Sequence, residues 1–225
     1  MAVRMGYYSE KLSGQRLRLC YELAPPRVQR YLEAEIDFVL RYIRPSCRVL
    51  ELGCGYGRVL RPLVDCAAVV LGIDTSLDSL RLARAELGGK CRLAAMDAVA
   101  LALADAAFDL VICVQNGIAA FSVDKRKLIG EAIRVTRPGG RVLFSTYSEK
   151  FWDHRLEWFQ IQAAHGLIGE LDPEATGAGV IACKDGFRAE AVSPEGFRSL
   201  LAGYERPPRI TEVDGSSLFC EIAVA

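Results

Sequence analysis

The stretch VLELGCGYGR, residues 49–58, decides the fold and the first functional hypothesis. It begins as an apolar run typical of a buried strand, and glycines follow at positions 53, 55 and 57. Glycine lets the backbone turn sharply and lets a ligand approach the main chain, and a helix after the turn offers free N–H groups. We expect a helix directly after the turn. An ordinary left-handed turn explains one such glycine, whereas three at alternating positions predict a ligand-binding loop.

The spacing of these glycines separates two kinds of nucleotide-binding loop. A dinucleotide site of the G-x-G-x-x-G type needs its third glycine at position 58, which is occupied by Arg58. The observed G-x-G-x-G pattern does not encode close packing around a pyrophosphate. A nicotinamide-dependent oxidoreductase therefore stays only as an alternative.

Five apolar runs predict strands that are buried on both faces. They cover residues 49–50, 69–73, 91–93, 108–114 and 141–144. Helical patterns alternate with these runs, and this alternation predicts a doubly wound parallel sheet with helices on both faces.

Helix ends are marked by caps and breakers. Pro25-Pro26 opens a helix ahead of the first strand, Ser76 caps a second that Gly88-Gly89 ends, and Ser122 starts a third that ends at the turn of residues 137–140. Beyond the fifth strand the pattern changes to an aromatic helical stretch, a hairpin, a short helix and a second hairpin. These segments are residues 151–159, 179–192, 193–204 and 209–224.

Acids follow the second and third strands. Asp74 comes 21 residues after Gly53, where a carboxylate can accept both hydroxyls of a ribose. The alternative role for Asp74 is a helix N-cap together with Thr75 and Ser76. Asp97 follows the third strand and can accept from an exocyclic amine such as that of adenine.

With these motifs in order, the stretch from Cys47 to Tyr147 resembles the core of class I S-adenosylmethionine-dependent methyltransferases, in particular the type 11 and type 25 small-molecule methylases. The resemblance implies an α/β, Rossmann-like sheet of seven strands, mostly parallel with an antiparallel last strand, and S-adenosyl-L-methionine as cofactor. It implies a methionine site at the glycine turn, a ribose site at Asp74, an adenine site after the third strand and a turn beside the methyl group after the fourth. The matching residues are Glu51, Gly53, Cys54, Gly55, Gly57, Asp74 with Thr75, Met96, Asp97, Ala98, Gln115 and Asn116.

We expect one methyltransferase domain over residues 1–225. Its parts are N-terminal cap helices (1–45), a cofactor-binding core (46–146), a substrate-covering insertion (147–204) and a final β-hairpin (205–225).

Methyl transfer to a small-molecule N, O or S atom is the expected reaction. The sulfonium is already an activated electrophile, so the protein mainly aligns the nucleophile and excludes water. A general base is needed only for a phenol, thiol or protonated amine, and Tyr147, Asp153 and His154 are the catalytic candidates. Substrate-binding candidates are Tyr7, Asn116, Tyr147 and Trp152.

The N-terminal tyrosines have two interpretations. Tyr7 and Tyr8 form a lid in the first, with the Tyr8 ring against the cofactor, because a cation over an aromatic face gains about 0.5 to 2 kcal/mol. In the second interpretation they pack on the sheet as part of a helix.

Two subtypes of acceptor lose support. Asn116 is followed by Gly117-Ile118, so the Asn/Asp-Pro-Pro-Tyr motif for planar nitrogens in nucleobases and protein glutamine is absent. Arsenite methylation relies on clustered thiolates, and here Cys20, Cys54 and Cys183 would have to meet in space.

Composition limits the partners. Lys plus Arg and Asp plus Glu both number 28, which argues against nucleic acid. The uncharged stretch of residues 110–123 is too short for a bilayer, and Met1 to Lys11 lacks the apolar core of a secretory signal, so we expect a cytoplasmic protein. Eight cysteines without C-x-x-C predict reduced thiols and no metal site. A catalytically silent cofactor-binding protein remains an alternative, and the sequence leaves the acceptor and the oligomeric state open.

Overall fold

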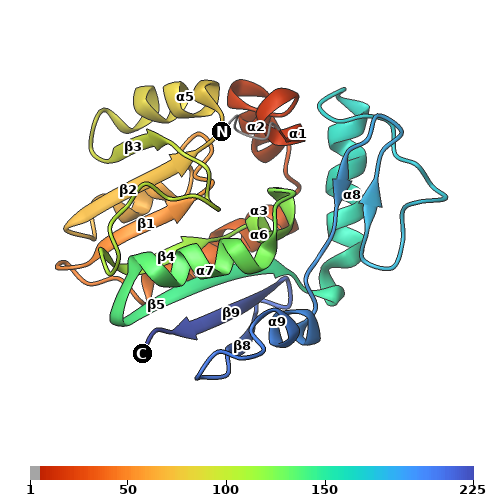
Figure 1. Cartoon of the computed structure of the whole chain (residues 1–225). Helices are drawn as coiled ribbons and strands as arrows, with labels where there is room; N and C mark the ends of the chain where they lie inside the picture. The colour runs from red at the N-terminus through yellow and green to blue at the C-terminus, as the bar shows by residue number, and fades with distance from the viewer. Residues whose placement is uncertain (1–5) are drawn as a thin grey trace.

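A seven-stranded sheet with helices on both faces forms the body of the molecule (Figure 1). The computed structural model describes residues 6–225; residues 1–5, part of the expected cap and of the segment inspected for a signal, lie outside them. The strand order is β3-β2-β1-β4-β5-β9-β8, and β9 runs antiparallel to both neighbours. This confirms the expected fold class.

The strands and helices are bounded as follows. The main sheet comprises β1 (Arg48–Leu52), β2 (Val69–Asp74), β3 (Arg92–Ala95), β4 (Phe108–Cys113), β5 (Thr136–Tyr147), β8 (Arg209–Val213) and β9 (Ser217–Ala223), and a separate hairpin comprises β6 (Ile181–Ala182) and β7 (Arg188–Ala189). The helices are α1 (Tyr7–Glu10), α2 (Gly14–Glu22), α3 (Pro26–Leu40), α4 (Leu60–Leu63), α5 (Leu77–Leu87), α6 (Gly117–Ala120), α7 (Lys125–Val135), α8 (Trp152–Ala164) after a 3₁₀ turn (Glu149–Phe151), and α9 (Pro194–Leu200).

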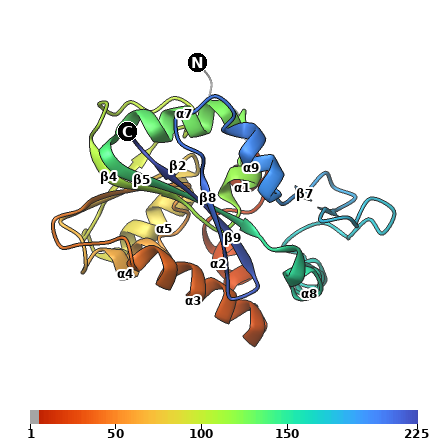
Figure 2. The same cartoon turned by 90° about the horizontal axis from the view of Figure 1, so that it is seen from below.

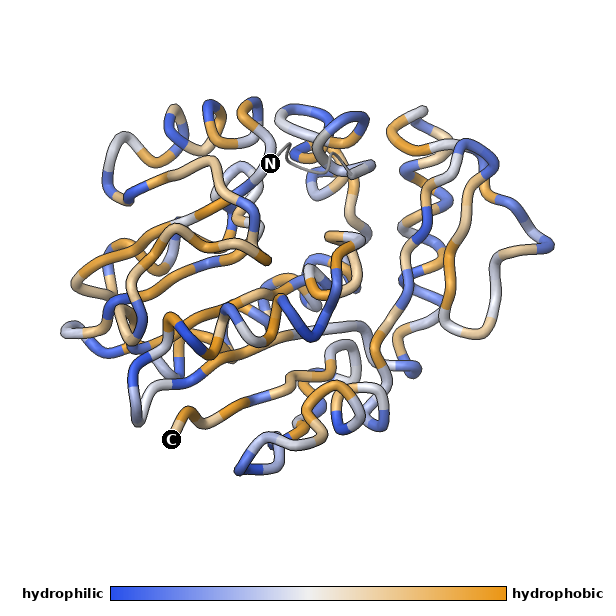
Figure 3. The backbone as a smooth tube through the Cα atoms, viewed as in Figure 1, coloured by the Kyte–Doolittle hydropathy of each residue, from blue (hydrophilic) through white to orange (hydrophobic). Residues whose placement is uncertain are grey.

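Alternating strand residues feed two hydrophobic layers, one on each face of the sheet. Leu50 and Val111 pack with α7 and α9, whereas Val49 and Leu110 pack with α3, α4 and α5. Figure 2 shows the two groups of helices on opposite sides of the strands. The central strands are mainly apolar in Figure 3, as expected for strands covered on both faces.

Several predicted boundaries are wrong by a few residues. The helix expected to start at Ser122 begins at Lys125, because Asp124 is the residue whose side chain accepts the first N–H groups. The turn of residues 137–140 lies inside β5, where the ladder to β4 shifts register. The glycine loop leads only into the four-residue α4, which begins at Leu60. Ser76 does cap α5 as predicted, and Gly88 ends it in the left-handed conformation.

The segment between β5 and β8 divides into two parts. Residues of α8 and the β6–β7 hairpin stand beside the sheet, as Figure 1 shows, and form an aromatic cluster with α2 and α3. Helix α9 instead buries Phe197 and Leu201 in the layer that contains α7. Within the expected covering insertion of residues 147–204, only α8 and the β6–β7 hairpin stand beside the sheet, and we call these two elements the cover. Helix α9 packs on the sheet itself.

Six of the eight cysteines are buried and all eight are free thiols. Within residues 6–225, no helix is both long and apolar enough to cross a membrane.

Candidate functional site

A cavity lies at the carboxyl ends of β1, β2 and β4. Strand β1 stands between β2 and β4, so the chain leaves this edge of the sheet in two directions, which is where open α/β sheets bind ligands. Helices α1, α2 and α8 stand around this edge (Figure 1). Trp158 on α8 donates from its indole Nε1 to the carbonyl oxygen of Cys20 on α2 at 2.8 Å, so two covering helices are bonded to each other.

The glycine turn after β1 forms part of the cavity wall. Gly53 and Gly55 line it with φ of 72° and 53°. A Cβ atom on Gly53 would lie 2.3 Å from Cζ of Phe121, which lines the same cavity. Gly57 lies outside the lining set, and a Cβ there would meet Leu87 of α5 at 2.8 Å. The first two glycines therefore shape the cavity and the third permits helix packing.

The cavity wall is acidic at this end. Glu51, Asp74 and Asp97 line it, and among the described residues no Lys, Arg or His does. Asp74 accepts from the backbone N–H of Gly55 and from that of Ser76, each at 2.8 Å. Since Ser76 itself caps α5, Asp74 is not the N-cap residue that the alternative interpretation required.

Glu51 is buried and incompletely paired. The residue is 3% exposed, and its Oε2 atom has no hydrogen-bond partner within the described structure. Burial and the charge of Asp74 raise the pKa of Glu51 to about 8, and the charge of Arg58 opposes this rise. A buried carboxylate oxygen without a donor is destabilising, so this site fits a ligand that brings a cationic donor.

Aromatic side chains form the opposite end of the cavity. They are Tyr8, Tyr21, Tyr31, Tyr147, Trp158 and Phe159. Behind Tyr147 lies the guanidinium of Arg155, 4.2 Å from the ring centroid and 1% exposed as a residue. Arg155 donates to the carbonyl oxygens of Gly179 and Ala189, which ties the β6–β7 region to the end of β5.

The structure brings most of the predicted site residues to this one cavity. The predicted residues that line it are Tyr8, Glu51, Gly53, Gly55, Asp74, Thr75, Met96, Asp97, Ala98, Gln115 and Tyr147. Cys54 and Gly57 are buried beside it without lining it.

Five other predicted side chains are not brought to the cavity. Asp153 and His154 lie on the exposed face of α8. Tyr7 donates to Asp185 Oδ2 at 2.7 Å and packs edge-on against Phe187. The amide of Asn116 is hydrogen-bonded to Thr146 and to the carbonyl oxygen of Glu190. Trp152 is also outside the lining set, where Trp158 is present instead.

The sequence pattern did not predict Tyr21 of α2 and Tyr31 of α3 as cavity residues, and it favoured Trp152 where Trp158 lines the cavity. Positions 155, 158, 159 and 162 form the buried face of α8 at helical spacing, so this periodicity would have selected Trp158. Tyr31 belongs to the apolar stripe of α3, and nothing local distinguished it from a core residue.

The three cysteines considered for arsenite chemistry do not share one cluster. Cys20 and Cys183 belong to the aromatic cluster of α2 and α8, and Cys54 belongs to the layer under α3 and α5. Burial raises the pKa of Cys20 to about 12 and that of Cys183 to about 11, so both are neutral thiols. Within residues 6–225, no group of three His, Cys, Asp or Glu side chains is arranged to hold a metal ion.

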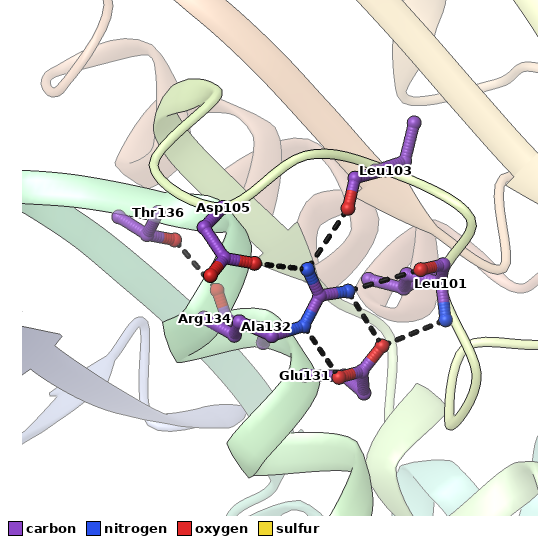
Figure 4. Close-up of polar contacts among 7 residues, drawn as sticks. All are labelled: Leu101, Leu103, Asp105, Glu131, Ala132, Arg134 and Thr136. Carbon is purple, nitrogen blue, oxygen red and sulfur yellow. Dashed lines mark hydrogen bonds and ion pairs between the residues drawn. The ribbon is translucent and has the colours of Figure 1, made fainter.

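Arg134 on α7 fixes the segment that follows Asp97. Its five guanidinium N–H groups lie within 2.6 to 3.0 Å of five acceptors, which are Oε1 and Oε2 of Glu131, Oδ1 of Asp105 and the carbonyl oxygens of Leu101 and Leu103. Figure 4 shows the guanidinium at the centre of this network. Glu131 also accepts from the backbone N–H of Leu101 at 2.7 Å. The loop that presents Asp97 is therefore anchored to α7.

Replacing Arg134 by Ala should lower the free energy of unfolding by about 2 kcal/mol, because the change removes the guanidinium donor from two carboxylates and two carbonyl oxygens. Urea denaturation measures this loss, and amide hydrogen exchange should increase over residues 97–105. Arg198→Ala is the control, since the pair that Arg198 forms with Glu195 is exposed on both sides. Equal effects of the two substitutions would contradict the anchoring role.

Comparison with known proteins places this geometry in a family. A family model described as "Methyltransferase domain" matches residues 49–140. The arsenite methyltransferase of Aquipseudomonas alcaligenes is 28% identical over 206 residues, which cover 78% of this chain and 57% of that protein. The 2-methyl-6-phytyl-1,4-hydroquinone methyltransferase of Synechocystis is 30% identical over 149 residues, or 61% of this chain and 46% of that protein. The chain thus spans about half the length of these curated relatives.

Solved structures share the whole fold. The PH0226 protein of Pyrococcus horikoshii has a TM-score of 0.65 and 20% identity over 90% of this chain and 93% of its own. The magnesium protoporphyrin IX methyltransferase of Synechocystis with bound SAH has a TM-score of 0.64 and 17% identity over 97% of both chains. At these identities the structures show the fold alone. Together with the family match over residues 49–140 and the curated relatives, this shared fold supports a class I S-adenosylmethionine-dependent methyltransferase.

Proposed function

We propose that the protein transfers a methyl group from S-adenosylmethionine to an N, O or S atom of a small molecule. The observation that carries the proposal is the unpaired Glu51 oxygen in a cavity that also contains Asp74 and the glycine turn. The curated relatives support methyl transfer, and the ubiquinone biosynthesis O-methyltransferase of Idiomarina loihiensis is one whose name states transfer to oxygen.

The acidic end of the cavity suits the cofactor. Glu51 would accept a hydrogen bond from the ammonium of the methionine part, and Asp74 would accept from the ribose hydroxyls. Gly53 and Gly55 let the ligand lie against the backbone. Asp97, on the loop anchored by Arg134, would accept from adenine. When bound, the cofactor supplies an activated methyl group on a sulfonium.

The aromatic end suits an uncharged, flat acceptor. The rings exclude water and offer stacking surfaces, and within residues 6–225 no basic side chain lines the cavity to pair with an acidic acceptor. Burial raises the pKa of Tyr147 to about 12, so at neutral pH this residue is a phenol that orients an acceptor rather than a strong base. Asp153 and His154 are exposed, which leaves neither as a base for the cavity.

The two alternatives differ from this proposal in measurable ways. A nicotinamide-dependent oxidoreductase is disfavoured because Arg58 stands at the third glycine position, where its guanidinium lies 5.1 Å from the ring of Tyr21. A catalytically silent protein would keep the cavity and bind the cofactor without turnover.

Binding calorimetry should detect S-adenosylhomocysteine with micromolar affinity and neither nicotinamide dinucleotide. Transfer of labelled methyl groups to a panel of uncharged phenols, quinols, thiols and amines then tests catalysis. Preference for a nicotinamide cofactor would refute the proposal, and binding without transfer to any acceptor would favour the silent protein.

Replacing Asp74 by Asn should weaken S-adenosylhomocysteine binding by about 10- to 100-fold, because hydrogen bonds to a charged group contribute about 1.5 to 3 kcal/mol. Asp109→Asn is the matched control, since Asp109 lies near the amino end of β4 and accepts from the N–H of Arg48. Unchanged affinity in Asp74→Asn would remove the ribose assignment.

Affinity for S-adenosylhomocysteine should rise as pH increases from 6 to 8.5. A ligand ammonium favours ionised Glu51, whose pKa of about 8 in the free protein leaves it mostly protonated at pH 6. The rise should be about tenfold or more. Glu51→Gln should reduce both the affinity and this slope; an identical slope in the variant would show that another group controls it.

A further inference from the structure

The turn after β4 has an unfavourable backbone conformation. Gln115 and Asn116 have φ of 55° and 62°, in the left-handed region that residues with a Cβ atom rarely adopt. Consecutive residues of this kind persist only where the surroundings hold them, and such turns concentrate at ligand sites. The contacts that stabilise this turn therefore bear on its function.

Side chains from two elements of the core hold the first residue. The backbone N–H of Gln115 lies 3.0 Å from Oε2 of Glu35 on α3 and 2.8 Å from Oγ of Ser145 on β5. Both are oxygen acceptors, so one N–H is shared between them. The contact joins residues 80 positions apart in the chain.

The second residue is held through its side chain. Asn116 Oδ1 accepts from Thr146 Oγ1 at 2.8 Å, and its Nδ2 donates to the carbonyl oxygen of Glu190 at 2.8 Å. Thr146 in turn accepts from the backbone N–H of Val192. Both polar atoms of the Asn116 amide thus join the turn to β5 and to the segment after β7, whereas Nε2 of Gln115 has no hydrogen-bond partner within the described structure.

Burying the carboxyl group of Glu35 is unfavourable for the stability of the fold, which a purely structural contact would not require. It is 0% exposed, and its second oxygen, Oε1, accepts from Ser217 Oγ at 2.9 Å. Burial raises its pKa to about 7, while the serines, Arg58 and the N–H of Gln115 oppose that rise. The charge of Glu35 also raises the pKa of Tyr31, which lies one helical turn earlier, and those of Tyr147 and Cys113. An apolar side chain would fill this position without the cost of burying an acid.

The side chain of Gln115 is the part of this turn that faces the cavity. It lines the cavity, and its side-chain Nε2 atom is buried without a hydrogen-bond partner within the described structure. A buried amide donor without a partner is destabilising unless a ligand accepts from it. The same turn corresponds, by the resemblance, to the one beside the transferred methyl group.

We propose that Glu35 is a positioning residue, which holds the turn after β4 so that the Gln115 amide contacts the reacting end of the bound ligands. The amide would donate to an oxygen of the acceptor, which narrows the substrate class to molecules with a carbonyl or hydroxyl oxygen near the methylated atom. This inference rests on the proposed function.

Two ligands that differ only at the reacting end test the positioning role. Sinefungin carries an amine-bearing carbon where S-adenosylhomocysteine has its sulfur, so the ratio of their dissociation constants reports the surroundings of the methyl position. Glu35→Gln should change this ratio at least fivefold, and Ser145→Ala should change it in the same direction by less. Glu221→Gln is the matched control for a buried acid, because Glu221 on β9 is 7% exposed and pairs with Tyr42 and Arg141. Its ratio should equal that of the wild type.

A ligand-free measurement separates this inference from the proposed function. The amide proton of Gln115 should shift downfield in NMR spectra as pH rises through the titration of Glu35, and the shift should disappear in Glu35→Gln. Absence of that titration in the wild type overturns the inference, and so does an unchanged ratio in Glu35→Gln that still binds both ligands. A wild-type protein that shows the titration and binds neither ligand overturns the proposed function, and with it the role assigned to Gln115.

Discussion

The carboxylate of Glu51 lies inside the protein at the carboxyl end of β1, and one of its oxygens has no partner. Desolvation makes such an ion unfavourable, so the folded chain tolerates it only as a neutral acid or with a cationic partner. The charge of Arg58 favours the ionised form and that of Asp74 disfavours it, and within the described residues no side chain donates a hydrogen bond to Oε2. A positively charged ligand would supply the donor that this oxygen lacks.

The cover over this site depends on contacts between distant parts of the chain. Arg18 of α2 pairs with Glu86 of α5, while Arg16 of α2 donates to the carbonyl oxygens of Gly166 and Leu167 after α8. Helix α2 therefore connects the core to the cover across the mouth of the cavity. Because α2, the Arg155–Tyr147 contact and the Asn116 hydrogen bonds all join the cover to the core, its position and the shape of the aromatic end are set together.

Local sequence was sufficient for the parts of the site that belong to the core. The glycine turn, Asp74 and Asp97 each follow a strand, and strands that are buried on both faces are easily seen as apolar runs. The site residues that were not predicted correctly depend on tertiary structure. Tyr31 and Glu35 looked like one stripe of a packing helix, and only the fold brings Glu35 to Gln115. His154 was chosen for its chemistry, although helical phase places it on the exposed face of α8.

A crystal structure with S-adenosylhomocysteine tests the central claim most directly. We expect the ligand ammonium within hydrogen-bond distance of Glu51 Oε2, the ribose hydroxyls on Asp74, and the sulfur between the Gln115 turn and the tyrosines. A ligand bound elsewhere, or one that leaves the Glu51 oxygen without a donor, would contradict the account.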